Sequence, residues 1–251
     1  MNHIDLFSGI GGFALAARWA GIETIAFCEK DEFCREVLKK HWPDVFIFDD
    51  IITMHHFSHV DLLTAGFPCQ PFSVAGKRKG KDDDRYLWPE TIRVIRECRP
   101  SWLILENVPG IIPSLDPILE DLEREGYTWR AYLISASSVG APHKRERLWV
   151  IAYRDSERCN KWGNHRQKRS FFDDWQWNIE TIQPEWSQFV PESWETLQAE
   201  GWLALNYHAS RIDDGLPNRL DRLKSLGNSI VPQIPYIFMK AIQTLYVGLV
   251  K

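Results

Sequence analysis

Short apolar runs alternate with helical patterns along the first 153 residues of the chain. The apolar runs that predict strands lie at 4–7, 24–27, 45–48, 60–65, 102–105, 127–134 and 148–153. Helical patterns follow the first two runs, ending near residues 20 and 41, and lie again at 87–98 and 117–125. Strands that alternate with helices form a mostly parallel sheet covered by helices on both faces, so the pattern predicts an α/β fold. In such sheets, ligands bind at the carboxyl ends of the strands.

The pattern changes after residue 153. Residues 155–220 are polar, contain six tryptophans and show no clear periodicity, whereas residues 232–249 read as a final amphipathic helix. We therefore expect a main domain at 1–154, a small irregular lobe at 155–220 and a segment at 221–251 that returns to the main domain.

Composition limits the class of protein. With 251 residues, of which 44% are hydrophobic, the chain can bury one sizeable core. We expect a cytoplasmic protein without a membrane segment, because no run of about 18 apolar residues occurs and the N-terminus lacks signal-peptide features. The five cysteines are odd in number and form no CxxC pair, which predicts neither a disulfide framework nor a metal site. Most of them should be small buried residues.

Charge is distributed unevenly. The formal net charge is −4, yet basic residues are concentrated at 77–81, at 144–147 and at 154–169. The last of these stretches contains six basic and two acidic residues. Any one cluster is ordinary surface charge, but three clusters in irregular sequence favour a phosphate-binding face.

The first chemical motif is DLFSGIGGF at 5–13, where a strand enters a glycine turn that opens a helix. Glycines there let the backbone approach a nucleotide-like ligand, although a tight turn without a ligand explains them equally well. Two acids follow later strands: Glu29 is placed to bind ribose hydroxyls, and Asp50 to accept a hydrogen bond from an adenine amino group. Both acids are otherwise helix caps or solvated turn residues.

The second motif is GFPCQPFS at 66–73, after the fourth predicted strand. Cys69 lies between two prolines that fix the backbone, beside a charged loop, which makes it a candidate nucleophile. Glu106 begins the ENVPG motif at the end of the fifth strand, on the same sheet edge as Cys69. A carboxyl group near a thiolate suits proton donation to a substrate ring.

Two further motifs lie near the C-terminal half. In KRERLW at 144–149, strand alternation would point Arg145 and Arg147 the same way, so that they could hold a carboxylate and a base carbonyl. A basic surface strand is the ordinary alternative. LGNSIVP at 226–232 precedes the last predicted helix and by itself predicts its N-cap.

Taken together and in this order, the motifs resemble the cytosine-5 DNA methyltransferase family. The resemblance implies a Rossmann-like fold that depends on S-adenosylmethionine. It implies a cofactor pocket formed by Phe7, Gly9, Gly11, Gly12, Glu29, Asp50, Ile51, Pro68 and Asn228.

The resemblance also implies catalytic roles. Cys69 would add to C6 of cytosine, which makes C5 able to accept a methyl group. Glu106 would bind N3 and the exocyclic amine, Arg147 would hold O2, and Arg145 would support the site. Because the ring is approached from its face, the base must leave the duplex. The basic loop 73–86 would close over the DNA.

As partners, the resemblance implies double-stranded DNA, read by the lobe at 155–220, and a monomer with a possible cognate restriction endonuclease. Three features depart from the family: His143 replaces a glutamine, residues 210–219 replace a segment with an Arg-Glu pair, and the chain is short.

Three alternatives stay open. A related enzyme that methylates cytosine in tRNA would share these motifs, and so would a catalytically inactive DNA-binding relative. A nucleotide-binding oxidoreductase would explain the glycine turn, but its GxGxxG pattern is absent and Cys69 and Glu106 would have no role.

Overall fold

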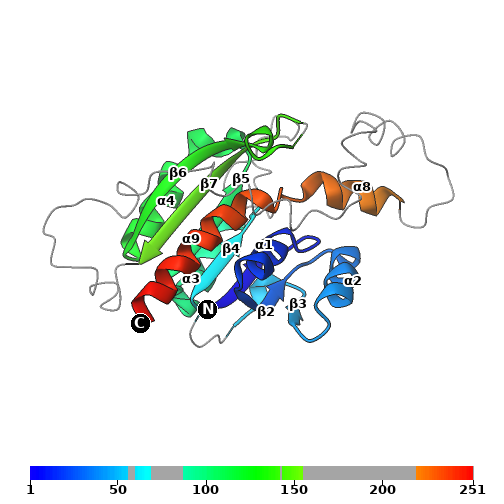
Figure 1. Ribbon diagram of the computed structural model, residues 1–251, viewed down its shortest axis with the longest axis horizontal. Coiled ribbons are helices and arrows are strands. Elements are labelled where there is room, and N and C mark those ends of the chain that lie inside the picture. Colours follow the sequence, from blue (N-terminus) through cyan, green and yellow to red (C-terminus); the bar gives the residue numbers. More distant parts are fainter. Residues whose placement is uncertain (56–59, 69–86, 142, 155–218, 251) are drawn as a thin grey trace, which may run out of the picture. The chain divides into compact units, whose positions relative to one another are not determined.

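The computed structural model describes residues 1–55, 60–68, 87–141, 143–154 and 219–250 (Figure 1). Nearly all of them belong to one compact unit, Met1–Asn164 together with Leu223–Lys251. The lobe expected at 155–220 lies outside the described residues except for its last two positions, so the three-part division stays a prediction.

A seven-stranded sheet organises this unit (Figure 1). Its strands are β1 (Asn2–Leu6), β2 (Glu23–Cys28), β3 (Phe46–Phe48), β4 (Leu62–Ala65), β5 (Trp102–Asn107), β6 (Tyr127–Ser135) and β7 (Glu146–Arg154). The order is β3-β2-β1-β4-β5-β7-β6, in which β7 runs antiparallel to both of its neighbours. The predicted mostly parallel sheet is therefore confirmed.

Helices flank the strands. They are α1 (Gly12–Ala20), α2 (Glu32–His41), α3 (Trp88–Cys98), α4 (Asp116–Arg124), α8 (Arg219–Asn228) and α9 (Gln233–Val250). Short 3-10 turns lie at η1 (Ile51–Thr53), η4 (Pro109–Ser114) and η5 (Ala136–Val139). None of the described helices is long and apolar enough to cross a membrane.

Alternation along the strands supplies two buried faces. On one face, Leu6 and Leu105 belong to a core cluster that also contains Ile95 of α3 and Leu122 of α4. On the other face, α1 and α9 lie side by side (Figure 1), and the Trp149 ring of β7 contacts rings from both helices, Phe13 and Phe238. The sheet is thus covered on both sides, as predicted.

Two local predictions need correction. Residues 226–228 of the LGNSIVP motif end helix α8, and α9 begins only at Gln233, so only the remaining part, 229–232, directly precedes the last helix. The amide of Ser229 donates to the carbonyl of Ser225 at 2.9 Å, which continues the helical bonding to the end of α8. Arg145 lies one residue before β7, so strand alternation does not set its direction.

Candidate active site

Three parallel strands end together at one edge of the sheet. Leu6 of β1 is paired with Ala65 of β4, and Ala65 is paired with Leu105 of β5. The residues that follow therefore lie side by side: the glycine turn, the Gly66–Pro68 segment and Glu106. Cys69 comes directly after Pro68 but lies outside the described residues, as does the loop 73–86.

The glycine turn combines close packing with open space. Gly11 has φ 89°, and a Cβ there would lie 2.6 Å from the Trp42 ring. A Cβ on Gly12 would lie 2.6 Å from Ile230. Gly9 has φ 53°, and a Cβ there would meet nothing within 4 Å. Gly11 and Gly12 thus let protein segments approach, while Gly9 leaves room for a ligand.

Phe7 opens this turn in an unusual conformation. Its φ is 56°, in the left-handed region that side chains other than glycine rarely adopt. Such strain persists where the surrounding structure imposes it, and it is commonest at ligand sites.

Glu29 joins the end of β2 to the glycine turn. One carboxylate oxygen accepts the Gly9 amide at 2.7 Å, and the other accepts the Asp31 amide at 2.8 Å. Since each carboxylate oxygen has two acceptor positions, these bonds leave capacity for ligand hydroxyls.

Asp50 follows β3 and caps η1. Its carboxylate accepts the Ile52 amide at 3.0 Å and contacts the Lys30 ammonium at 3.1 Å. These interactions, the backbone hydrogen bond first, lower the pKa of Asp50 and keep it ionised as an acceptor. The alternative role as a helix cap is therefore confirmed for Asp50, and it does not exclude binding to an amino group.

These residues fit an adenosine-bearing cofactor. β2 pairs in register with β1 and β3, through Leu6, Cys28 and Phe48, so Glu29 and Asp50 follow adjacent strand ends beside the turn. Open space at Gly9 and two acceptors beside it are what a nucleoside with a diol and an amino group requires.

Glu106 and Arg147 form an ion pair at the end of β5. Arg147 Nε lies 2.9 Å from Glu106 Oε1, and the two side chains are 20% and 12% exposed. A Cβ on Gly66 would lie 3.4 Å from the other Glu106 oxygen, so glycine leaves space beside the carboxyl group. Burial raises the pKa of Glu106, while the charges of Arg147 and Arg145 oppose this rise. The site can thus hold a proton closer to neutral pH than an ordinary glutamate.

Arg145 points to a different partner. Its Nη1 donates to the Gly227 carbonyl at 2.7 Å, beside Asn228 at the end of α8. Its buried Nε has no hydrogen-bond partner among the described residues. Burial, followed by the charge of Arg147, lowers its pKa. The two arginines of the KRER motif therefore have different partners: Arg147 pairs with Glu106, and Arg145 binds the end of α8.

Asn107 has a role that the sequence analysis missed. This buried amide donates to the Phe67 carbonyl at 3.0 Å and accepts from the Val108 amide at 2.9 Å. It fixes the segment that leads through Pro68 to Cys69. The available signal was its place in the ENVPG motif, directly after Glu106 at the end of β5.

The described cysteines are poor nucleophiles. Cys28, Cys34 and Cys98 are buried and free, as predicted. Burial raises the thiol pKa to about 12 for Cys28 and Cys98, and to about 11 for Cys34. Thiols with such values are inert near neutral pH.

Comparisons with known proteins match one family model and several methyltransferases. The family model for C-5 cytosine-specific DNA methylase matches residues 1–201. The type II methyltransferase M2.BsuMI of Bacillus subtilis is 36% identical over 162 residues, 61% of this chain and 42% of that protein. M.HhaI of Haemophilus parahaemolyticus, also a type II methyltransferase, is 32% identical over 166 residues, 62% of this chain and 50% of that protein. The chain thus spans half or less of these relatives.

Solved structures share the fold. The DNMT2 of Spodoptera frugiperda has a TM-score of 0.53 and 24% identity, over 62% of this chain and 50% of that one. The Dnmt2 methyltransferase of S. pombe has a TM-score of 0.53 and 20% identity, over 67% and 57%.

Proposed function

The chain belongs to the C-5 cytosine-specific DNA methylase family, and from this premise we propose that it methylates C5 of cytosine in double-stranded DNA with S-adenosylmethionine. One observation carries the proposal. The buried Glu106–Arg147 pair lies beside Gly66, three residues before Cys69 in the sequence, at the edge of the sheet where β1, β4 and β5 end together.

The proposed chemistry begins at Cys69. Its thiolate forms a bond to C6 of the flipped-out base, and the displaced electron pair is taken up toward N3, where Glu106 supplies a proton. Arg147 holds the Glu106 carboxyl group in place and would bind the base O2. Arg145 supports the site from the end of α8.

Bound S-adenosylmethionine would supply the methyl group in an activated form. C5 would form a carbon–carbon bond to the methyl group while the methyl–sulfur bond of the donor breaks, which leaves S-adenosylhomocysteine. C5 then loses its proton to solvent, the freed electron pair restores the C5–C6 double bond as the Cys69–C6 bond breaks, and the N3 proton returns to Glu106. The methyl donor would lie against Phe7 and the turn glycines Gly9, Gly11 and Gly12, with Glu29 on the ribose and Asp50 and Ile51 on the adenine. Pro68 and Asn228 would border it.

We further propose that different segments of the chain have different roles. Residues 1–154 and 221–251 hold the cofactor and carry the chemistry, and residues 155–220 read the target. The basic clusters supply phosphate contacts. We propose a cytoplasmic monomer. We also propose a cognate restriction endonuclease, because two relatives are named type II methyltransferases.

Methyl transfer from labelled S-adenosylmethionine to unmethylated duplex DNA tests this function. Wild type should label C5 of cytosine, and Cys69→Ala should lose at least about a thousandfold in rate, because the covalent route is removed. Cys98→Ala is the matched control, since that thiol is buried at the end of α3, before β5 begins. Bisulfite mapping of the product would then give the target sequence.

Duplex DNA that contains 5-fluorocytosine gives a second readout. Fluorine at C5 cannot leave as a proton does, so the covalent adduct at C6 should persist as a denaturation-resistant complex. We expect this complex with wild type and with Cys98→Ala, but not with Cys69→Ala. Transfer to tRNA but not to DNA would favour the RNA-directed alternative. Full activity of Cys69→Ala would refute the proposed nucleophile.

A further inference from the structure

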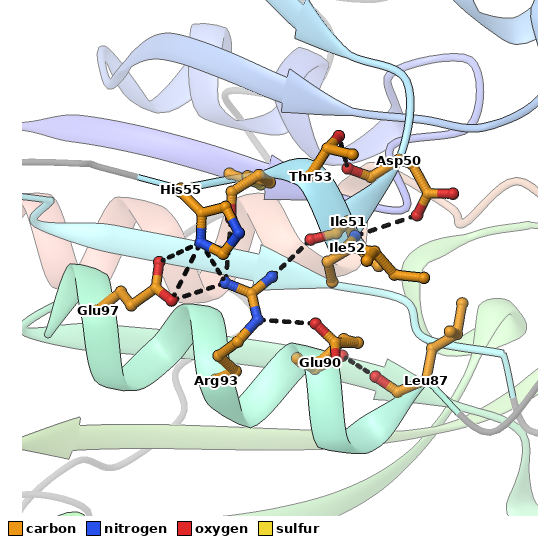
Figure 2. A network of polar contacts seen from close by, with 11 residues as sticks. Asp50, Ile51, Ile52, Thr53, His55, Leu87, Glu90, Arg93 and Glu97 are labelled. Atoms are coloured by element: carbon orange, nitrogen blue, oxygen red, sulfur yellow. Dashed lines mark hydrogen bonds and ion pairs between the residues drawn. The ribbon is translucent and has the colours of Figure 1, made fainter.

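Arg93 of α3 reaches across to the turn that follows β3 (Figure 2). Its Nη2 donates to the Ile51 carbonyl at 2.6 Å, and its Nη1 donates to the Met54 carbonyl at 3.1 Å. The two carbonyls lie at the start and just past the end of η1, the turn that Asp50 caps. One guanidinium thus fixes the turn at both ends.

Two glutamates of the same helix orient this guanidinium through ion pairs (Figure 2). Glu90 Oε2 lies 2.7 Å from Arg93 Nε, and Glu97 Oε1 lies 2.7 Å from Nη1. The glutamates are placed one turn before and one turn after Arg93, where helical spacing brings side chains together. His55 Nδ1 lies 3.1 Å from the same Nη1.

The turn is otherwise held by short-range bonds and by burial. The Thr53 amide donates to the Asp50 carbonyl, and the Met54 amide donates to the Ile51 carbonyl at 3.3 Å. The Asp50 carboxylate accepts the Ile52 amide and contacts Lys30, but neither bond ties the turn to α3. Ile51 and Met54 are buried, but burial is not directional. The charged hydrogen bonds from Arg93 do fix the backbone, because they are directional and stronger than neutral ones.

We propose that Arg93 is a positioning residue for cofactor binding, which acts through η1 to set Asp50 and Ile51 against the adenine. This role rests on the proposed function. An arginine suits it better than a lysine, because its planar fork can serve two carbonyls and two carboxylates at once.

Calorimetric binding of S-adenosylhomocysteine is the first test. Arg93→Met should raise its Kd about tenfold, the size expected when hydrogen bonds from a charged group are lost. Arg93→Lys should give an intermediate Kd. Arg96→Met is the matched control and should bind like wild type, because Arg96 lies on the same helix but pairs with Glu125. All measurements are made below the thermal transition of each variant, so that only folded protein is compared.

A double-mutant cycle asks whether Arg93 acts through the turn. If it does, the Kd increases of Arg93→Met and Asp50→Ala should not multiply in the double variant, because either change already disturbs the same contact. In methyl transfer, Arg93→Met should raise the KM for S-adenosylmethionine and leave kcat at saturation within about twofold of wild type.

The outcomes separate the two proposals. If wild type binds no S-adenosylhomocysteine, the proposed function fails and this role fails with it. If wild type binds and Arg93→Met binds equally well, or if the two effects multiply, only the role of Arg93 is overturned. A fall in kcat with an unchanged KM would also overturn it.

Discussion

At the scale of single residues, a buried row of polar side chains crosses three strands beneath the glycine turn. His3 of β1 contacts the Thr24 hydroxyl of β2 at 2.9 Å and the Thr64 hydroxyl of β4 at 2.8 Å. Thr64 in turn donates to Asp5 Oδ1 at 2.6 Å. The second oxygen of Asp5 has no hydrogen-bond partner among the described residues. An ionised carboxylate would be costly there, so the geometry favours the protonated acid.

The pKa values of the two buried groups shift in opposite directions. Burial raises the pKa of Asp5 from 3.8 to about 8, with Thr64 opposing and Glu29 adding to the rise. Burial lowers the pKa of His3 from 6.5 to about 3. Both side chains are therefore uncharged in the folded protein between about pH 3 and pH 8. They act on stability with opposite signs, because one retains a proton on folding and the other gives one up.

Asp5→Asn tests this assignment through the pH dependence of the free energy of unfolding. Between about pH 6.5 and 8, folded Asp5 keeps a proton that the unfolded chain has lost. The free energy of unfolding of wild type should therefore fall by about 1.4 kcal/mol for each unit by which the pH rises. Asp5→Asn should lack this loss. Between about pH 4 and 6.5 the Asp5 and His3 contributions cancel in wild type, but in Asp5→Asn stability should rise with pH. Urea denaturation across pH 4–9 measures both slopes.

Asp44→Asn is the control for that experiment, because Asp44 is exposed. Its stability curve should run parallel to that of wild type. A constant offset between wild type and Asp5→Asn at every pH would mean that Asp5 is ionised in the folded protein.

At the scale of elements, apolar runs that alternate with helical patterns were enough to predict most of the sheet. The apolar runs of β1 and β5 are buried on both faces, and Asp31 caps α2 by accepting the Cys34 amide, so each element is specified locally. The antiparallel insertion of β7 between β5 and β6 was not predictable. Its run at 148–152 is buried throughout, and a strand buried on both faces shows no alternation that would reveal its direction.

Helix α8 was missed for a different reason. Its sequence is polar and ends at Gly227 and Asn228, two residues that disfavour helix interiors. Its end is fixed by tertiary contacts instead, since the Gly227 carbonyl accepts Arg145 and the Ser225 hydroxyl lies 3.4 Å from Cys34 Sγ. Local pattern cannot report such contacts.

Asn107, at the carboxyl end of β5, should orient the segment that carries Cys69. Asn107→Asp keeps the acceptor for the Val108 amide but removes the donor to the Phe67 carbonyl, which should let the Pro68–Cys69 segment shift. Because a displacement of about 1 Å can cost on the order of a hundredfold in rate, we expect kcat to fall by about ten- to a hundredfold. The Kd for S-adenosylhomocysteine should stay within about twofold of wild type, and steady-state methyl transfer with calorimetry measures the two quantities.

Tyr127→Phe provides the comparison. It removes a buried hydrogen bond of the same kind, from the Tyr127 hydroxyl to the Pro100 carbonyl, at the amino end of β5. It should lower thermal stability without changing kcat. Equal kcat losses in both variants would mean that Asn107 contributes only to folding.

At the scale of the whole molecule, the parts of the site differ in how far the sequence revealed them. Glu29, Asp50 and Glu106 were placed correctly at strand ends, because parallel strands bring their carboxyl ends to one edge whatever their order. The partners of these side chains came only from the structure. Arg147 on Glu106, Arg93 on η1 and Asn107 on Phe67 join residues about 40 positions apart, and no spacing rule covers such pairs.

Binding to DNA should depend on where positive charge lies, since the net charge of the whole chain is −4. Lys168 and Arg169 belong to the basic stretch 154–169, whereas Lys39 and Lys40 lie in the last turn of α2. Lys168→Gln with Arg169→Gln should weaken duplex binding and reduce the slope of log K against log salt by about 1 to 2, because each lost phosphate contact removes about 0.9. Lys39→Gln with Lys40→Gln makes the same change in net charge and should leave the slope as in wild type.

Both variants should bind S-adenosylhomocysteine normally. Fluorescence anisotropy across a salt series decides between the two readings: equal losses would show that only overall charge matters, and a loss confined to the first variant would place a DNA contact within 154–169.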